Sequence, residues 1–233
     1  MKTALITGGS KGIGFGIAEA LLRAGGWNVV ITGRNKEVIS LASKNLEAIS
    51  PGKSLGLACD VRSYHEQEAC ARQVTERFGS IDVLVANAGI GHFAPIEHLT
   101  IDQWQETIDI NLTGVFFSVK ACLSELIKSK GYIITISSLA GTNFFANGSA
   151  YNASKFGLTG FTQAAMLDLR KYGIRVTTIM PGSVATDFSG NTHQSDETWK
   201  IQIEDIGQMV ADLMKLNSRT LPSKIEVRPS LPK

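Results

Sequence analysis

Short apolar runs alternate along the chain with longer stretches in which apolar residues recur at helical spacing. The short runs are rich in β-branched and aliphatic residues and predict strands at 4–6, 29–31, 55–57, 83–85, 133–136, 176–179 and 225–227. The longer stretches predict helices at about 13–25, 36–49, 63–78, 101–128, 150–171 and 204–216. The alternation predicts an α/β fold in which a doubly wound parallel sheet of about seven strands carries helices on both faces.

The composition fits one domain with a small-molecule ligand. The 233 residues are 43% hydrophobic and no linker or repeat divides them, so we expect a single domain over residues 1–233. Lys and Arg number 23 against 21 Asp and Glu, and this near balance argues against nucleic-acid and membrane-surface partners.

The cysteines give no sign of a disulfide framework or a metal site. Cys59, Cys70 and Cys122 are odd in number and dispersed, and they lack Cys-x-x-Cys or Cys/His ligand spacing. The first apolar stretch ends at Gly8, and no apolar run approaches the roughly 18 residues of a membrane span. We therefore expect reduced thiols, no metal and a cytoplasmic location.

A glycine-rich segment joins the first predicted strand to the first predicted helix. It reads Thr7-Gly8-Gly9-Ser10-Lys11-Gly12-Ile13-Gly14. Glycines let the backbone turn sharply and approach a pyrophosphate, whose charge is met by the amides of a helix N-terminus. The segment predicts a dinucleotide site in a Rossmann-type fold, with the spacing Gly-x-x-x-Gly-x-Gly in place of the usual Gly-x-Gly-x-x-Gly.

The same segment also satisfies the Gly-x-Ser-x-Gly elbow of serine hydrolases, with Ser10 as the nucleophile. An elbow needs an upstream loop for the oxyanion hole, and here only the seven residues of the first strand precede the turn. Asp187 and His193 are available to complete a triad. A serine hydrolase therefore remains a disfavoured alternative.

The end of the second predicted strand carries a basic residue where coenzyme choice is usually made. Arg34 lies 20 residues after Gly14, and this strand end offers no carboxylate. A carboxylate here would accept the ribose hydroxyls of NAD, whereas a guanidinium suits the 2′-phosphate of NADP. Lys11 could reach the same phosphate. We therefore expect NADP(H).

Tyr151 and Lys155 stand at i and i+4 of a predicted helix, so their side chains leave one face a turn apart. An ammonium beside a phenol favours the phenolate, which would suit the tyrosine to proton transfer. Ser138 ends a predicted strand thirteen residues before Tyr151, at the edge where a coenzyme would lie. Ser137 is equally polar, and the residues alone leave the choice between the two serines open.

Together these motifs resemble those of the classical short-chain dehydrogenases/reductases over nearly the whole chain. They occur in family order and spacing as Thr7-Gly8-x-x-x-Gly12-x-Gly14, Asp60-Val61, Asn87-Ala88-Gly89, Asn111, Ser138, Tyr151-x-x-x-Lys155 and Pro181-Gly182 through Thr186. The resemblance is to NADP-preferring members and implies reduction of a ketone or aldehyde by NADPH.

The resemblance implies a role for each of four catalytic residues. Tyr151 would donate the proton, and Lys155 would support Tyr151 and bind the nicotinamide ribose. Ser138 would polarise the substrate carbonyl, and Asn111 would hold a water that continues a proton relay from Lys155. The implied coenzyme contacts are Gly8, Ser10, Lys11, Gly12, Ile13, Gly14, Arg34, Asp60, Val61, Asn87, Ala88, Gly89, Tyr151, Lys155, Pro181, Gly182, Val184 and Thr186.

The substrate is less closely defined by these motifs. The family's substrate lid corresponds to about 187–204, which is short and polar, and the expected pocket residues are His92, Phe93, Phe144, Phe145 and Phe188. The C-terminal segment resembles compact carbonyl reductases and sepiapterin reductase-like members. A 3-oxoacyl-carrier-protein reductase is an alternative, in which Lys128, Lys130, Arg170 and Lys171 would meet an acyl carrier protein. A non-catalytic dinucleotide-sensing protein is another.

Two apolar stripes fall on helices that family members use for contacts between subunits. They run around Phe116, Phe117, Val119 and Leu123, and around Phe161, Ala164 and Leu167. We therefore expect a homodimer or homotetramer.

Overall fold

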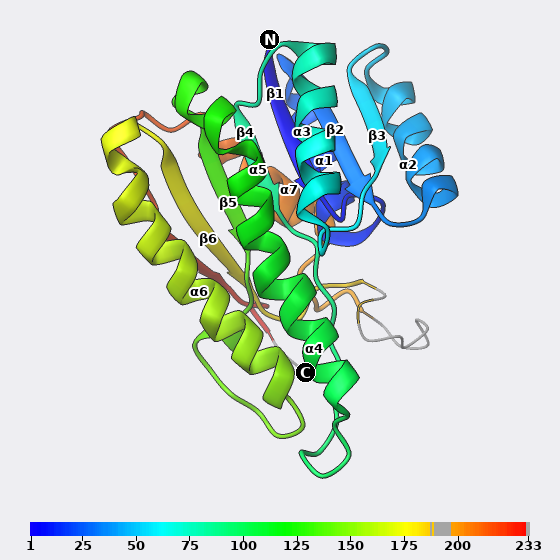
Figure 1. The fold of residues 1–233 in the computed structure, drawn as a ribbon, viewed down its shortest axis with the longest axis vertical. Helices are drawn as coiled ribbons and strands as arrows, with labels where there is room; N and C mark the ends of the chain where they lie inside the picture. Colours follow the sequence, from blue (N-terminus) through cyan, green and yellow to red (C-terminus); the bar gives the residue numbers. More distant parts are fainter. Residues whose placement is uncertain (187, 189–196, 232–233) are drawn as a thin grey trace.

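The computed structural model describes residues 1–186, 188 and 197–231. All seven predicted strands form and make one parallel sheet in the order β3-β2-β1-β4-β5-β6-β7 (Figure 1). Their bounds are β1 Lys2–Thr7, β2 Trp27–Gly33, β3 Ser54–Ala58, β4 Val83–Ala86, β5 Tyr132–Ile136, β6 Arg175–Pro181 and β7 Lys224–Val227. The strand order reverses direction between β1 and β4, as in doubly wound folds, so the predicted fold class is confirmed.

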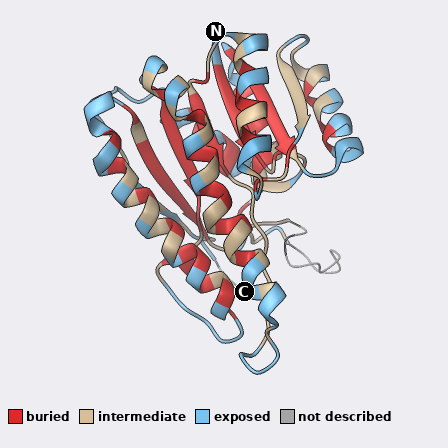
Figure 2. Ribbon diagram, in the orientation of Figure 1, coloured by how far each residue is buried: buried red, intermediate tan, exposed pale blue. Residues whose placement is uncertain are grey.

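Helices cover both faces of this sheet. They are α1 Gly12–Ala24, α2 Lys36–Ile49, α3 Tyr64–Phe78, α4 Ile101–Ile108, α5 Gly114–Ser129, α6 Ser149–Leu169 and α7 Ile203–Leu213. Successive side chains of β1 point to opposite faces, so Ile6 joins the core beneath α1, α2 and α7 while Leu5 joins the core beneath α3, α5 and α6. Buried residues accordingly line the sheet and the inner sides of the helices (Figure 2).

Short polar side chains begin three of the helices. Asn35 accepts a hydrogen bond from the amide of Val38 at the start of α2, and Ser63 accepts one from Glu66 at the start of α3. Thr100 and Gln103 form a reciprocal capping box at the start of α4. Each side chain satisfies an amide that has no partner within its helix, which defines where the helix begins.

The single helix predicted over 101–128 is interrupted. A π-helical turn, Asp109–Thr113, separates α4 from α5 and brings Asn111 to a fully buried position. By length and hydropathy alone the continuous stretch Ile101–Ser129 would suffice to cross a membrane, and 44% of its most apolar 18-residue window is buried. Val119 and Leu126 of this stretch pack in the core against the sheet. The fold therefore uses its apolar face for internal packing.

Candidate functional site

A cavity of about 1200 Å³ lies at the carboxyl edge of the sheet, where the loops after β1, β2, β4, β5 and β6 meet. Its lining includes most of the predicted site residues: Gly8, Ser10, Lys11, Gly12, Ile13, Arg34, Val61, Asn87, Ala88, Gly89, Ser138, Tyr151, Lys155, Pro181, Gly182, Val184 and Thr186. Gly14, Asp60 and Asn111 are the predicted site residues outside that lining. The structure therefore brings together residues from nearly the whole length of the chain.

The glycine-rich segment forms one wall of the cavity, and its shape requires glycine. Gly8 and Gly12 have positive φ angles of 64° and 59°. A Cβ at Gly8 would lie 2.8 Å from the Cα of Ala88, so β1 and β4 approach each other here through backbone alone. The start of α1 follows this turn and presents its amides to the cavity side, so the segment suits a pyrophosphate.

Asn87 holds the glycine-rich turn in place. Its side-chain amide donates hydrogen bonds of 2.9 Å to the carbonyl oxygens of both Thr7 and Gly8. The Thr7 hydroxyl accepts hydrogen bonds of 3.1 Å from the amides of Asn87 and Ala88. A Cβ on Gly14 would lie 2.5 Å from the Asn87 amide nitrogen, so Gly14 contributes by leaving room for this clamp rather than by lining the cavity.

The two adjacent serines after β5 have different surroundings. The Ser137 hydroxyl is buried against α6, 3.0 Å from the Thr159 hydroxyl and 3.3 Å from the Lys155 carbonyl oxygen. The Ser138 hydroxyl instead donates a 3.4 Å hydrogen bond to the carbonyl oxygen of Pro181, and it lies close enough to Tyr151 to lower the pKa of the phenol. It also accepts one of 3.1 Å from the amide of Ala140. Ser138 is therefore the serine that faces the tyrosine.

Tyr151 and Lys155 lie on one face of α6, as their spacing predicts. The Lys155 ammonium lies 5.6 Å from the centre of the Tyr151 ring and donates a 3.0 Å hydrogen bond to the carbonyl oxygen of Ile136. Burial lowers the pKa of Lys155 from 10.5 to about 8, because the charged form loses its hydration.

The pKa of Tyr151 moves in the opposite direction from the one expected from the sequence. Burial raises it, and the hydrogen bond with Ser138 opposes that rise only in part. The expectation considered only the neighbouring ammonium and neglected the loss of water around the phenol. Tyr151 is therefore a protonated group at neutral pH, suited to donating a proton.

Asn111 lies behind the cavity rather than in its lining. Its amide oxygen accepts a 2.8 Å hydrogen bond from the amide of Ile90, and its amide nitrogen donates to the Ile90 carbonyl oxygen and to the Ser154 hydroxyl. These contacts attach the π-helical turn to the loop after β4 and to α6. An added Cβ on Gly89 would lie 3.3 Å from the Asn111 amide oxygen and 3.6 Å from the Lys155 ammonium, so Gly89 keeps this corner open.

Asp60 also lies outside the lining, because a neighbouring arginine binds it. The Arg62 guanidinium donates to both Asp60 carboxylate oxygens, and this pairing lowers the pKa of the carboxyl group. Val61 lines the cavity next to it. Cys59 and Ile110, which the motifs did not single out, line the cavity as well, and each directly precedes a predicted site residue.

Aromatic rings surround Tyr151 at one end of the cavity. The ring centre of Phe93 lies 5.4 Å from that of Tyr151, and the ring centre of Phe188 lies 5.7 Å from it. Phe145 contacts Phe93, and Phe144 also lines the cavity. The predicted pocket phenylalanines are thus gathered at the tyrosine. His92 does not line the cavity, because its imidazole is turned to the carboxylate of Glu106.

The cations proposed to meet a carrier protein lie at the opposite edge of the sheet. Lys128 and Lys130 are at the end of α5, just before β5 begins, and Arg170 and Lys171 precede β6. These are the amino ends of the strands, whereas the cavity lies at their carboxyl ends. Asp187, His193 and half of the expected substrate lid fall outside the described residues.

The sequence of this chain matches an established family model. The model for short chain dehydrogenases matches residues 2–197. The chain belongs to the short-chain dehydrogenase family. This dehydrogenase is 42% identical over 190 residues to trans-4-hydroxycyclohexanecarboxylate dehydrogenase of Sinomonas cyclohexanicum, with 79% of this chain and 73% of that protein covered. It is 32% identical over 232 residues to the sepiapterin reductase of Chlorobaculum tepidum, with 97% and 95% covered.

A solved structure gives the same result for the fold. The alcohol dehydrogenase of the archaeon Thermococcus sibiricus, complexed with 5-hydroxy-NADP, superposes with a TM-score of 0.92 at 28% identity, covering 100% of this dehydrogenase and 98% of that chain. The resemblance drawn from the motifs is therefore confirmed, and members of this family use a nicotinamide dinucleotide. The open glycine turn and the helix N-terminus beside it fit such a ligand.

Proposed function

We propose that this dehydrogenase uses NADPH to reduce a ketone or aldehyde to an alcohol, with Tyr151 as the proton donor. The observation that carries the proposal is the joint position of three side chains at the cavity: the Tyr151 hydroxyl, the neighbouring Ser138 hydroxyl, and the buried Lys155 ammonium. A nicotinamide dinucleotide, when bound, supplies the hydride. The three side chains supply the proton and stabilise the developing alkoxide.

Each of the three residues has a separate task in this mechanism. The Ser138 hydroxyl donates a hydrogen bond to the substrate carbonyl oxygen and so stabilises negative charge there. Tyr151, whose pKa burial keeps high, gives its proton to that oxygen. The Lys155 ammonium then stabilises the phenolate that remains, because two opposite charges attract strongly where water is excluded. Asn111 positions the neighbouring loop through Ile90.

The preference for NADP(H) rests on two cations. Lys11 and Arg34 both line the cavity, from the glycine-rich turn and from the end of β2. A 2′-phosphate between them would gain two charge-assisted contacts that NAD cannot make. The name of the Thermococcus sibiricus structure adds support, since that protein is complexed with a form of NADP.

The substrate we propose is a cyclic or aromatic carbonyl compound. The rings of Phe93, Phe145 and Phe188 border Tyr151 and offer flat apolar surfaces. The relative from Sinomonas cyclohexanicum is named for a substrate with a ring, a secondary alcohol and a carboxylate. Lys200 and Arg228 also line the cavity, so the first substrates to test include 4-oxocyclohexanecarboxylate.

The alternatives have weaker support. Ser10 lines the cavity, and no histidine is among the described residues of that lining, so a hydrolase remains disfavoured. For a carrier-protein reductase, the cations proposed to bind the carrier lie at the amino ends of the strands, away from the cavity of the same chain. The carrier protein would then have to deliver its substrate to the cavity of another copy of the chain. A dinucleotide-sensing protein without turnover would not need Ser138, Tyr151 and Lys155 to lie together at the cavity. We further propose a cytoplasmic homo-oligomer.

The test is a turnover assay with NADPH and NADH over a panel of cyclic ketones, diketones, aldehydes and 3-oxoacyl thioesters. Loss of the reduced nicotinamide absorbance is measured, and coenzyme binding is measured separately by calorimetry. Turnover with NADPH supports the proposal, and a strong preference for carrier-tethered thioesters supports the carrier-protein reductase. Coenzyme binding without any turnover would favour a sensing role, and absence of binding would contradict the proposal. Ester cleavage that Ser10→Ala abolishes would favour the hydrolase.

A further inference from the structure

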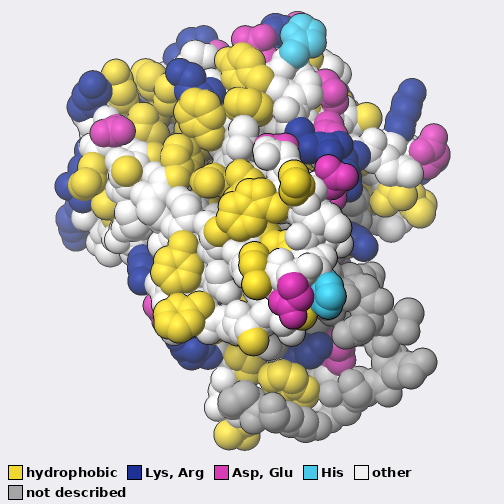
Figure 3. All heavy atoms as spheres, turned by 60° about the horizontal axis from the view of Figure 1, so that its bottom comes forward, with side chains coloured by type: hydrophobic (Ala, Val, Ile, Leu, Met, Phe, Trp, Pro, Cys, Tyr) yellow, Lys and Arg dark blue, Asp and Glu magenta, His cyan; other side chains and the backbone are white. Residues whose placement is uncertain are grey.

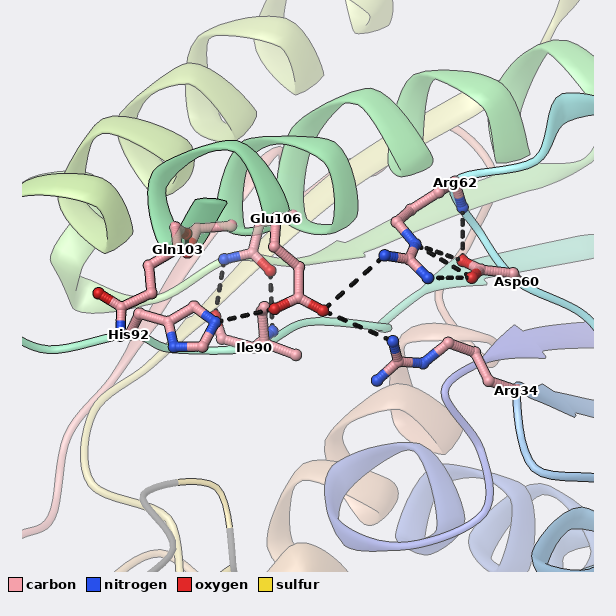
Figure 4. A network of polar contacts seen from close by, with 9 residues as sticks. Arg34, Asp60, Arg62, Ile90, His92, Gln103 and Glu106 are labelled. Atoms are coloured by element: carbon pink, nitrogen blue, oxygen red, sulfur yellow. Dashed lines mark hydrogen bonds and ion pairs between the residues drawn. The ribbon is translucent and has the colours of Figure 1, made fainter. Parts of the chain in front are cut away.

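A carboxylate from α4 reaches the proposed coenzyme-discriminating arginine. One oxygen of Glu106 lies 3.6 Å from the Arg34 guanidinium and 3.8 Å from that of Arg62. Its other oxygen lies 3.0 Å from Nε2 of His92 (Figure 4). Arg34 directly follows β2 and Glu106 belongs to α4, so this contact joins two segments that are far apart in the sequence.

Glu106 is held more firmly than Arg34. Arg62 is bound from its other side by Asp60, with a shortest separation of 2.5 Å, and His92 fixes the second Glu106 oxygen. The Arg34 side chain is 53% exposed and can therefore change rotamer at little cost. When an anion that binds Arg34 more strongly than Glu106 does enters the cavity, we expect the Arg34 side chain to move and the Glu106 carboxylate to keep its position.

The Arg34–Glu106 pair lies at the part of the cavity where the adenosine end of a bound dinucleotide would be expected. Gly33, Arg34 and Val61 line the cavity there. Ile110, one helical turn after Glu106, lines it too, so Glu106 lies on the same side of the helix at the rim. A 2′-phosphate bound by Arg34 would lie close to the Glu106 carboxylate.

We propose that Glu106 competes with the 2′-phosphate of NADP(H) for Arg34 and thereby weakens the preference of this dehydrogenase for NADP(H) over NAD(H). The inference rests on the proposed function and adds a specificity-determining residue to it. Binding of NADP(H) requires Arg34 to give up its ion pair with the Glu106 carboxylate and to bind the 2′-phosphate instead. It also places the negative charges of Glu106 and the 2′-phosphate near each other. Binding of NAD(H) requires neither, because the Arg34–Glu106 pair can remain.

The charge of Glu106 is secured by its neighbours. The hydrogen bond from His92 lowers the pKa of Glu106, and the charges of His92, Arg34 and Arg62 lower it further. The carboxylate is therefore ionised at neutral pH. The strand end itself has no carboxylate, yet the fold brings one close to Arg34 from a helix far along the chain.

The experiment compares dissociation constants of NADP⁺ and NAD⁺ for the full chain and for Glu106→Gln. We expect NADP⁺ to bind about fivefold more tightly to the variant, while NAD⁺ changes by less than about twofold. Asp102→Asn is the matched control, because Asp102 is exposed in the first turn of the same helix. This substitution also removes one negative charge from α4. The control variant should leave the ratio of the two constants unchanged. Thermal unfolding of each variant checks that it is folded.

A double variant separates competition from a general structural effect. In an Arg34→Ala background, Glu106→Gln should tighten NADP⁺ binding less than it does in the unaltered chain, because the competition for Arg34 is gone and only the repulsion between the carboxylate and the 2′-phosphate remains. An unchanged ratio in Glu106→Gln, or weaker NADP⁺ binding, would overturn the inference and leave the proposed function standing. Failure of the unaltered chain to bind either coenzyme would overturn the proposed function and this inference with it.

Discussion

Lys155 is a buried basic group at the candidate active site, and burial of its charge lowers the free energy of unfolding. The residue is 4% exposed, and its ammonium donates a hydrogen bond to the Ile136 carbonyl oxygen. Its pKa is about 8 in the folded chain against an ordinary 10.5, so the unfolded chain binds more protons between these two values. The free energy of unfolding should therefore rise with pH across this window, and the gain is absent below about pH 8, where both states bind the proton.

The variant Lys155→Met tests this coupling. Between about pH 7 and pH 10, the free energy of unfolding of the unaltered chain should gain about 2 kcal/mol relative to the variant, because only the lysine sheds its proton in the folded state. Urea unfolding at several pH values measures the difference. A constant difference across the range would show that Lys155 keeps an ordinary pKa in the fold.

At the residue scale, the sequence predicts which groups gather at the cavity but not their electrostatic state. Tyr151 and Lys155 follow from their spacing, and a serine follows from a strand end, since parallel strands bring their carboxyl ends together. The choice of Ser138 over Ser137 came from the family resemblance. The direction of the Tyr151 pKa shift depends on burial, which spacing cannot give. Glu106 was missed because its contact with Arg34 joins segments distant in the chain.

At the element scale, the ends of β1 and β4 are tied together by one amide side chain. Asn87→Ala removes both hydrogen bonds to the glycine-rich turn and leaves the Thr7 and Gly8 carbonyl oxygens without this donor. We expect a loss of about 2–3 kcal/mol in the free energy of unfolding, together with weaker coenzyme binding.

Asn217→Ala is the matched control for that substitution. Asn217 is exposed in a loop, where its side chain accepts one hydrogen bond from Arg219. We expect it to cost less than about 1 kcal/mol. Equal losses in the two variants, measured by urea unfolding, would show that the Asn87 clamp has no special importance.

The spacing of apolar residues does not predict where the helix over 101–128 is interrupted. Apolar spacing predicts one helix over 101–128, and that pattern continues across the π-helical turn Asp109–Thr113 without a break. The turn forms because the Asn111 side chain finds partners in Ile90 and Ser154, which belong to other segments. Tertiary hydrogen bonds of this kind leave no local signal in the sequence.

At the scale of the whole molecule, α5 and α6 keep apolar side chains on their outer faces. Phe116, Phe156 and Leu167 have exposures of 43%, 43% and 58%, and Phe116 contacts the ring of Phe161 on the neighbouring helix. Hydrophobic side chains are visible over much of the surface seen in Figure 3. A surface of this kind suits contact with a second copy of the chain.

The substitution Phe116→Glu tests that use of the surface. Light scattering should give a multiple of the 25.1 kDa chain mass for the unaltered protein and a smaller assembly for the variant, because a charge would be buried at the contact. Ile101→Glu, at an 85% exposed position at the start of α4, should leave the mass unchanged. A monomeric unaltered chain would contradict the proposed homo-oligomer.

The substitution Tyr151→Phe tests the central claim most directly, because it removes one hydroxyl from the cavity and keeps the ring that contacts Phe93 and Phe188. With a carbonyl substrate found in the turnover panel, hydride transfer from NADPH should fall by about a hundredfold or more while the dissociation constant of NADPH stays within about threefold. Turnover that survives the substitution would contradict the assignment of Tyr151 as the proton donor.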